Sequence, residues 1–253
     1  MPMPGFGLIV IGDEILSGRR EDKHFPAVRH LLADRGLRLA WVCYLGDDRQ
    51  RLTAALERTF AGTDVVLSTG GIGATPDDHT RQAAAAALGR PLALHPEAAA
   101  LIADRTREAG LPLTPERLRM GEFPEGATLI PNPVNRIPGF SLRDHHFVPG
   151  FPAMAQPMIA WVLDTHYRDR FGSEAEAEAS FVVHGLAEAA LTPLMEAIER
   201  DLPGARVFSL PHLDPERRTA YRIELGAKGE PEAVDEAVRR LREGATRLGG
   251  RID

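Results

Sequence analysis

The chain has 253 residues, enough for one large domain or two smaller ones, and its 43% hydrophobic and 26% charged residues are typical of a globular protein. The net charge of −6 argues against a general nucleic-acid-binding protein, and a single cysteine, Cys43, excludes an intrachain disulfide and a cysteine-based zinc site. The apolar run Leu8–Ile11 is too short for a signal peptide, and no segment approaches the roughly 20 apolar residues that span a bilayer. We therefore expect a cytoplasmic protein that does not bind membranes.

Strands and helices alternate through the first part of the chain. Apolar runs rich in β-branched residues predict the strands, and apolar residues at helical spacing predict the helices between them. In chain order the predicted elements are a strand at 5–11, a helix at 24–35, a strand at 39–45, a helix at 49–60, a strand at 64–67 and a helix at 81–88. This alternation predicts a parallel sheet with helices on both faces.

The next segment completes the same predicted domain. It contains helices at 96–109 and 115–120, short strands at 127–130, 139–142 and 146–148, and a closing helix at 152–167. The three short strands are expected to form an antiparallel edge of the sheet. The predicted fold class is α/β, with a three-layer α/β/α domain and a mostly parallel sheet over residues 1–168.

A second, small α+β domain is predicted after a polar, acidic linker at residues 169–179. Over residues 180–253 the predicted order is a strand at 180–185, a helix at 191–201, strands at 206–210 and 219–226, and a helix at 231–248. Acidic residues outnumber basic ones there, and the segment has no Gly-x-x-Gly loop. We therefore expect that it binds no nucleic acid.

Acidic loops follow each of the first three strands. They are Gly12-Asp13-Glu14, Gly46-Asp47-Asp48 and Gly73–Asp78. Since ligands of such sheets bind beyond the carboxyl ends of the strands, the three loops predict one site at that edge. The alternative for Asp48, and for Asp22 ahead of the helix at 24–35, is a helix cap.

The third of these loops carries the strongest local signal. Gly70, Gly71 and Gly73 lie between a buried strand and an alanine-rich helix, where backbone N–H groups favour phosphate. Two adjacent carboxylates, Asp77 and Asp78, then favour a bridging Mg²⁺, since bare carboxylate and phosphate repel each other. The alternative is a glycine-rich turn in which one of these aspartates only caps the helix.

The dipeptide His145-His146 is the other candidate for chemistry. Neighbouring residues of a strand point to opposite faces of the sheet, which makes the pair a poor metal chelate. A structural role for both histidines is predicted.

The ordered set of motifs resembles the molybdopterin-binding domain of the competence/damage-inducible CinA family. The motifs are Ile11–Gly18 with Asp22, Gly46-Asp47-Asp48, Thr69–Gly73 through Asp77, Asp78 and Thr80, Pro131-Asn132-Pro133, Pro138-Gly139, and Pro149–Pro152. They span about residues 5–165. Gly185–Leu191 is similar to the small KH-like domain that follows in CinA proteins. Because the sequence ends at Asp253, no amidase domain is expected and nicotinamide-nucleotide deamidation is not implied.

This resemblance implies a fold shared with molybdenum-cofactor biosynthesis proteins, which bind molybdopterin and in some cases adenylylate it with Mg²⁺. It also implies metal-dependent hydrolysis of ADP-ribose or a related dinucleotide, with Mg²⁺ or Mn²⁺ as cofactor. The implied catalytic residues are Asp47, Asp78 and Asp13, of which Asp47 and Asp78 are the implied metal ligands. Relatives form dimers or trimers, so a homo-oligomer is expected.

The same resemblance, together with the loops above, selects the residues expected to bind substrate or phosphate. They are Gly12, Glu14, Ser17, Gly18, Thr69, Gly70, Gly71, Gly73, Thr75, Asp77, Thr80, Pro131, Asn132, Pro138, Gly139, Pro149 and Gly150. Glu14 is the candidate general base by position. The expected partner is a small nucleotide or pterin.

The chain departs from the family pattern at four positions. His24 replaces an asparagine, Met120 a glutamine, Met154 a glutamate, and Asn135 a glycine. Asparagine tolerates positive φ well, so the turn at Asn135 is expected to survive. The lost polar groups leave two alternatives to hydrolysis: binding of a nucleotide or molybdopterin without turnover, and adenylyl transfer onto molybdopterin.

Overall fold

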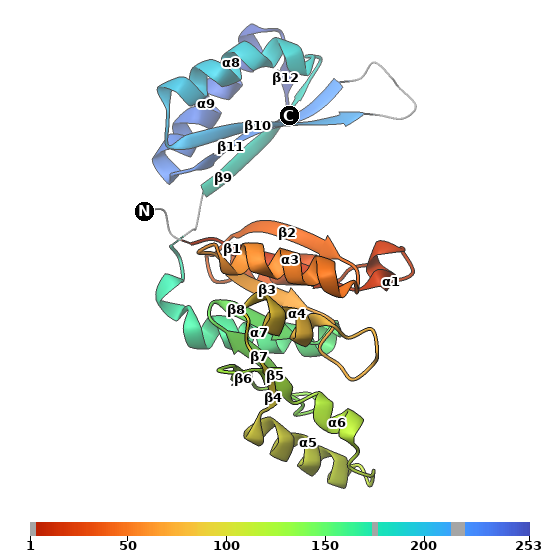
Figure 1. Cartoon of the computed structure of the whole chain (residues 1–253). Coiled ribbons are helices and arrows are strands. Elements are labelled where there is room, and N and C mark those ends of the chain that lie inside the picture. The colour runs from red at the N-terminus through yellow and green to blue at the C-terminus, as the bar shows by residue number, and fades with distance from the viewer. Residues whose placement is uncertain (1–3, 174–176, 214–220) are drawn as a thin grey trace. The chain divides into compact units, whose positions relative to one another are not determined.

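The computed structural model describes residues 4–173, 177–213 and 221–253, and the chain divides into two compact units, Met1–Glu174 and Ala175–Asp253. The first unit is built on a six-stranded sheet with the order β2-β1-β3-β8-β7-β6 (Figure 1). Its strands are β1 (Phe6–Ile11), β2 (Leu39–Leu45), β3 (Val65–Thr69), β6 (Thr128–Ile130), β7 (Gly139–Leu142) and β8 (His145–Val148). β2, β1, β3 and β8 run parallel, while β6–β7 and β7–β8 pair antiparallel. This confirms the predicted α/β class.

The alternation of side chains along β1 divides the core into two layers. Phe6, Leu8 and Val10 pack in one cluster with side chains of α2 (His24–Ala33) and α7 (Pro152–His166). Ile9 and Ile11 point the other way and pack with α3 (Arg49–Phe60) and α4 (Thr80–Ala87). Because both faces of β1 are buried, the strand reads as a continuous apolar run. The three-layer α/β/α arrangement follows directly.

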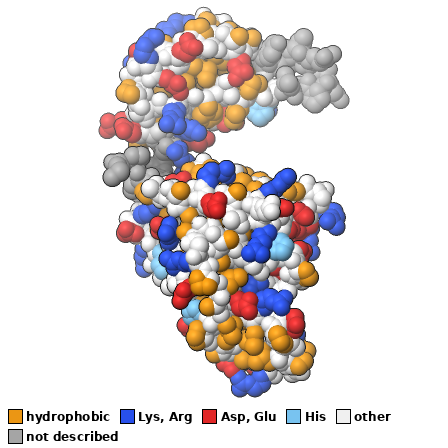
Figure 2. All heavy atoms as spheres, viewed as in Figure 1, with side chains coloured by type: hydrophobic (Ala, Val, Ile, Leu, Met, Phe, Trp, Pro, Cys, Tyr) orange, Lys and Arg blue, Asp and Glu red, His pale blue; other side chains and the backbone are white. Residues whose placement is uncertain are grey.

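Short elements outside the sheet were not all predicted. β4 (Leu92–Leu94) and β5 (Glu122–Pro124) form a two-stranded antiparallel sheet beside α5 (Pro96–Glu108) and α6 (Pro115–Arg119). The one-turn helix α1 (Asp13–Leu16) and the 3₁₀ helix η1 (Arg168–Arg170) were also missed. Figure 2 shows hydrophobic side chains on the surface of the α5–α6 region, where Leu111 and Leu113 are exposed.

The second unit is a four-stranded antiparallel sheet with the order β10-β11-β9-β12 and two helices on one face. Its elements are β9 (Ala177–His184), α8 (Glu188–Asp201), β10 (Ala205–Leu213), β11 (Tyr221–Gly229), α9 (Pro231–Arg247) and β12 (Arg251–Ile252). The segment predicted as a linker, 169–179, contains most of η1 and the start of β9, with 174–176 outside the described residues. The start of the strand predicted at 219–226 also lies outside them, and β12 was not predicted.

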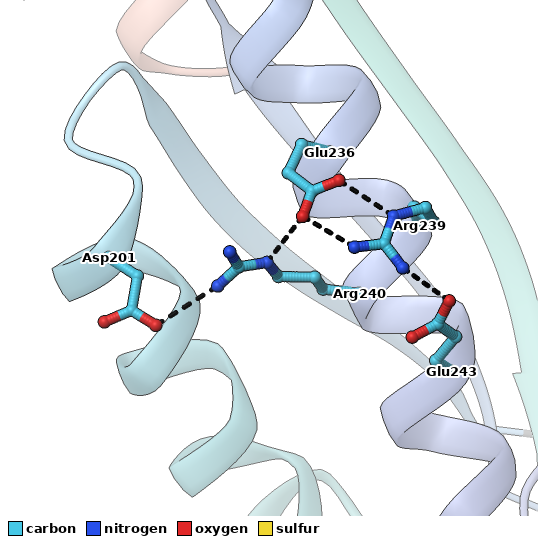
Figure 3. Close-up of polar contacts among 5 residues, drawn as sticks. All are labelled: Asp201, Glu236, Arg239, Arg240 and Glu243. Carbon is cyan, nitrogen blue, oxygen red and sulfur yellow. Dashed lines mark hydrogen bonds and ion pairs between the residues drawn. The ribbon is translucent and has the colours of Figure 1, made fainter.

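Charged side chains link the two helices of this unit (Figure 3). Arg240 donates to Glu236 on its own helix at 2.8 Å and to Asp201 at the end of α8 at 3.1 Å. Arg239 joins Glu236 to Glu243, one turn further along. Hydrogen bonds from Arg239 and Arg240 lower the pKa of Glu236 to about 2. Since all these groups are solvent-accessible, we expect the network to fix side-chain positions more than to add stability.

No helix in the described part of the chain has the length and apolar character needed to cross a bilayer.

His145 and His146 are structural, as predicted. The Nε2 atom of His145 lies 2.9 Å from the Thr59 hydroxyl, and its ring stacks on Phe60. His146 lies between two hydroxyls, with Nδ1 2.8 Å from Ser141 and Nε2 2.7 Å from Tyr167. Burial lowers the pKa of His145 to about 4 and that of His146 to about 3. The folded protein therefore holds both rings neutral.

This burial predicts a loss of stability in mild acid. The unfolded chain protonates both imidazoles below about pH 6.5 while the folded protein does not, so the unfolded state binds more protons and the free energy of unfolding falls as pH drops toward 4. We expect His146→Asn to reduce this slope by about 1.4 kcal/mol per pH unit in that window. Denaturant unfolding at a series of pH values measures it, and an unchanged slope would contradict the buried neutral ring.

Candidate functional site

A cavity of about 820 Å³ lies in the first unit at the carboxyl ends of β1 and β3 and above the loop that follows β8. Its wall includes these predicted site residues: Gly12, Asp13, Glu14, Asp47, Gly70, Gly71, Gly73, Thr75, Asp77, Asp78, Pro138, Pro149 and Gly150. The acidic loops after the first three strands therefore meet at one site, as expected for a parallel sheet.

The other predicted residues do not line this cavity: Ser17, Gly18, Thr69, Thr80, Pro131, Asn132 and Gly139. The Thr80 hydroxyl, predicted to bind phosphate, is buried and donates to the Gly70 carbonyl at 3.0 Å. The Asn132 side chain accepts the N–H of Val134 at 3.0 Å and so closes its own turn. Thr80 and Asn132 therefore shape the loops, because their side chains bond to backbone.

Gly70 lies where three strand ends converge. Its N–H donates to the Val148 carbonyl at 3.0 Å, and a Cβ at Gly70 would lie 2.3 Å from the carbonyl oxygen of Ile11. A Cβ on Gly150 would in turn lie 3.2 Å from the Cα of Gly70. These distances leave no room for a side chain at residue 70, and its φ of +101° is a conformation that favours glycine. Only glycine meets both conditions.

The loop beyond Gly70 leaves several backbone donors open. Within the described residues, no acceptor bonds the N–H groups of Gly71–Ala74. Gly71, at φ +69°, passes so close to Thr80 that a Cβ would lie 2.1 Å from the threonine hydroxyl. Successive free N–H groups in a tight loop before a helix are a typical phosphate-binding arrangement.

Arg81 supports this loop by a hydrogen bond to its backbone, a role that the sequence analysis did not predict. It is the largest fully buried side chain of those described, and it donates to the Gly73 carbonyl at 2.5 Å and to the carbonyl of Arg119. Burial lowers the pKa of Arg81, and the charge of Asp78 opposes that shift. The sequence feature that could have revealed this role is a single arginine at the start of an alanine-rich helix. The Arg81 side chain brings positive charge to the loop.

Asp13 and Asp47 form the acidic side of the cavity. Asp13 N–H donates to the Asp47 carboxylate at 2.9 Å, and Asp47 N–H donates back to the Asp13 carboxylate at 3.3 Å. Burial raises the pKa of Asp47, and the charges of Asp13, Glu14 and Asp77 raise it further, against the hydrogen bond from Asp13. Carboxylates crowded in this way repel one another, and a bound cation relieves the repulsion.

Asp78 has a different local role from the one implied for it. Its Oδ2 atom accepts the N–H of Thr75 at 2.8 Å and also the Thr75 hydroxyl, so this oxygen braces the loop. Asp77, not Asp78, is the loop carboxylate whose charge acts on Asp47. No group of three or more potential ligands that could hold a metal occurs among the described residues.

Two arginines on the wall were also missed. Arg20 pairs with Glu14 at 3.8 Å, and Arg19 donates to the Ser17 hydroxyl at 3.2 Å without a carboxylate partner in the described part of the chain. Exposed loop arginines have no periodic pattern that would reveal them. They bring positive charge to the cavity that Asp13, Asp47 and Asp77 also line.

Asp22 and Asp48 are caps, as the alternative interpretation held. Asp48 accepts the N–H of Arg51 at 2.8 Å at the start of α3. Asp22 accepts the N–H groups of His24 and Phe25 at 2.7 and 3.1 Å. His24 is buried and its Nε2 lies 3.2 Å from the Gly150 carbonyl, so the ring ties α2 to a cavity loop.

The turn around Asn135 is present, as expected, and the Arg136 N–H closes it on the Asn132 carbonyl, but it does not use a positive φ at Asn135. Among the described non-glycine residues, positive φ occurs at Arg136 and Arg143 and not at Asn135. The Asn135 side chain instead accepts the N–H of Ile137 at 2.9 Å and lies 3.5 Å from the Met154 sulfur. The Asn135 side chain closes the turn locally, and the left-handed residue is its neighbour Arg136.

The comparisons with known proteins agree with this geometry. The family described as "Probable molybdopterin binding domain" matches residues 7–168. The chain belongs to this family. A CinA-like protein of Geobacter metallireducens is 33% identical over 97% of this chain, which spans 60% of that relative's length. A protein of Aeropyrum pernix is 30% identical, with 98% of this chain and 96% of that protein covered.

A solved structure extends the match to the fold of the family. The crystal structure of the protein CinA with unknown function from Thermoplasma acidophilum has a TM-score of 0.58 and 27% identity, covering 64% of this chain and 97% of that one. The chain is a CinA-family protein with a molybdopterin-binding-like domain, as its motifs implied.

Adjacent aspartates with opposite roles give a direct test of the site. We expect Asp48→Ala to lower the free energy of unfolding by about 1 kcal/mol, because it removes a helix cap. Asp47→Asn keeps an oxygen to accept the Asp13 N–H and removes one of the crowded charges, so stability at pH 7 should stay equal or rise. Denaturant unfolding of both variants measures this, and equal losses would refute the assignment.

Proposed function

We propose that the cavity binds the phosphoanhydride of a nucleotide or dinucleotide and hydrolyses it with the help of Mg²⁺ or Mn²⁺. The observation that carries this proposal is that open loop amides and paired carboxylates line the same cavity: the amides are those of Gly71–Ala74, and the carboxylates are those of Asp13 and Asp47. A phosphate satisfies the amides, and a cation is needed to bring it beside the carboxylates.

Each group on the wall then has a role. The amides of Gly71–Ala74 bind one phosphate, and Arg81 behind them adds to the attraction. Arg19, which has no carboxylate partner within the described residues, neutralises charge on the substrate. Asp78 keeps the loop in its binding conformation through Thr75.

The donor set fits a hard divalent cation. Asp13 and Asp47 supply oxygen ligands, and Asp77 adds negative charge nearby. Mg²⁺ in nucleotide sites takes one or two carboxylates, with water and substrate phosphate filling the remaining positions, so two carboxylates suffice. When bound, the cation would polarise a phosphoryl oxygen and help orient the attacking water. In this proposal Asp47 remains a metal ligand and Asp13 replaces Asp78.

Glu14 is the proposed proton acceptor. It lines the cavity, and its ion pair with Arg20 is long, at 3.8 Å, which leaves the carboxylate free to accept a proton from water. Asp78 is less suited because Thr75 already donates to it twice.

Binding without turnover is the second candidate function. It is favoured by the family description, which names molybdopterin binding, and by the finding that no described cluster offers three metal ligands. A pterin phosphate would use the same loop amides. Adenylyl transfer onto molybdopterin would use them too, but it requires ATP and a pterin in one cavity. A homo-oligomer, a dimer or trimer, remains part of the proposal.

A hydrolysis screen tests the enzyme proposal. With ADP-ribose, FAD, NAD, CoA and ATP as substrates, we expect turnover of a dinucleotide that stops when the metal is removed, with AMP released from ADP-ribose. Asp47→Asn should reduce the rate by at least about 100-fold, while the cap variant Asp48→Ala keeps wild-type kinetics. Turnover that survives Asp47→Asn would refute the site, and ligand binding without any turnover would favour the second function.

The two-carboxylate site also predicts that metal and nucleotide bind together. We expect Mg²⁺ alone to bind weakly, with a Kd above about 1 mM, and the non-hydrolysable α,β-methylene-ADP to tighten Mg²⁺ binding at least about tenfold. Isothermal titration calorimetry measures both affinities. Asp13→Asn should abolish this effect of the nucleotide on Mg²⁺ binding. Equal Mg²⁺ affinity with and without nucleotide would contradict a site in which carboxylates and substrate phosphate bind the same ion.

A further inference from the structure

The wall of the cavity is chemically divided. Besides the charged groups, the loops around residues 135–138 and 149–154 and the end of α6 contribute apolar side chains to the same cavity. These are Met120, Ile137, Pro138, Phe151 and Met154, which we call the apolar wall. A charged phosphoanhydride gains little from contact with apolar side chains. We therefore expect a second, apolar part of the ligand to contact this surface.

Phe151 is the prominent member of the apolar wall. Its side chain is 58% exposed, although its backbone is fixed: the Phe151 carbonyl accepts the N–H groups of Met154 and Ala155 at 2.9 Å each. The residue directly follows Gly150, which packs against Gly70 of the phosphate loop. The backbone of Phe151 is therefore held at a defined place beside that loop, and its ring is open to solvent. An exposed aromatic ring on a rigid backbone is a stacking surface for a planar ligand group.

The polar groups near the apolar wall are directed at the protein. The Asn135 side chain accepts the N–H of Ile137 and lies against the Met154 sulfur, so its hydrogen-bonding capacity is used inside the loop. Met120 and Met154 present thioethers, which adapt their shape to a ring and contact its edge without a directional hydrogen bond. A planar group bound here is held by stacking and dispersion more than by recognition of its polar edge.

We propose that the apolar wall binds the heteroaromatic ring of a nucleotide, with Phe151 as the stacking residue and with little discrimination between purines. This inference rests on the proposed function, because it requires the phosphates to lie on the loop of Gly71–Ala74. It defines the substrate class as purine nucleotides selected by their phosphates and by a flat ring, not by the substituents of that ring.

Calorimetry with three probes tests the ring site without turnover. The probes, each with Mg²⁺, are α,β-methylene-ADP, its hypoxanthine analogue, and methylenediphosphonate, which has no ring. Wild-type protein should bind the two nucleotides with Kd values within about threefold of each other. Phe151→Ala should weaken α,β-methylene-ADP about tenfold or more and leave methylenediphosphonate unchanged, and Phe151→Trp should retain nucleotide binding.

Phe25→Ala is the matched control, since Phe25 is also a partly exposed phenylalanine, 36% exposed, that lies outside this cavity. Unchanged nucleotide binding by Phe151→Ala, or an equal loss for nucleotide and methylenediphosphonate, would overturn the ring site. Phe151-dependent binding in a protein that hydrolyses nothing would uphold the ring site and refute the pyrophosphatase. If Phe151→Ala hydrolyses ADP-ribose with the wild-type KM, the pyrophosphatase is upheld and the ring site is refuted.

Discussion

The close approach of three backbone segments at Gly70 is the constraint on which the site depends. Gly70 bonds to Val148 at the end of β8, faces the Ile11 carbonyl at the end of β1, and contacts Gly150 in the next loop. No side chain fits there, so the loop after β3 crosses the strand ends directly against the sheet. This crossing brings the open amides of Gly71–Ala74 to the edge where the other acidic loops end.

The charges of the site follow from that placement. Asp13 and Asp47 hold each other through reciprocal backbone hydrogen bonds. Burial raises the pKa of Asp47, and the charges of Asp13, Glu14 and Asp77 raise it further. The buried Arg81 supports the loop on the opposite side. Crowded carboxylates in one cavity with open N–H groups suit a ligand that combines a cation with an anion. The apolar wall around Phe151 adds room for a planar group beside them.

Much of the fold was predictable because its signals are local and periodic. The runs at β1 and β3 and the helical spacing in α2 and α3 define the layers, and they also place the acidic loops at one edge. Elements of two to four residues, such as β4, β5, β12 and α1, have no periodicity to detect. The sheet pairing of β4 with β5 joins segments far apart in the chain, which a local pattern does not reveal.

The side-chain roles were harder to predict, because loop conformation decides them. Asp77 and Asp78 are neighbours with the same chemistry, yet Asp78 accepts the backbone N–H of Thr75 while the charge of Asp77 acts on Asp47. The Asn135 side chain accepts the N–H of Ile137, and the residue with positive φ in this loop is Arg136 and not Asn135. Arg81, Arg19 and Phe151 belong to the site only through the way distant loops meet.

The most direct test is a crystal structure of the protein with Mn²⁺ and α,β-methylene-ADP, in which anomalous scattering locates the metal. The proposed site predicts an Mn²⁺ peak between the carboxylates of Asp13 and Asp47, with the phosphonate on the amides of Gly71–Ala74. Mn²⁺ bound at Asp78, or a phosphonate outside this cavity, would contradict it.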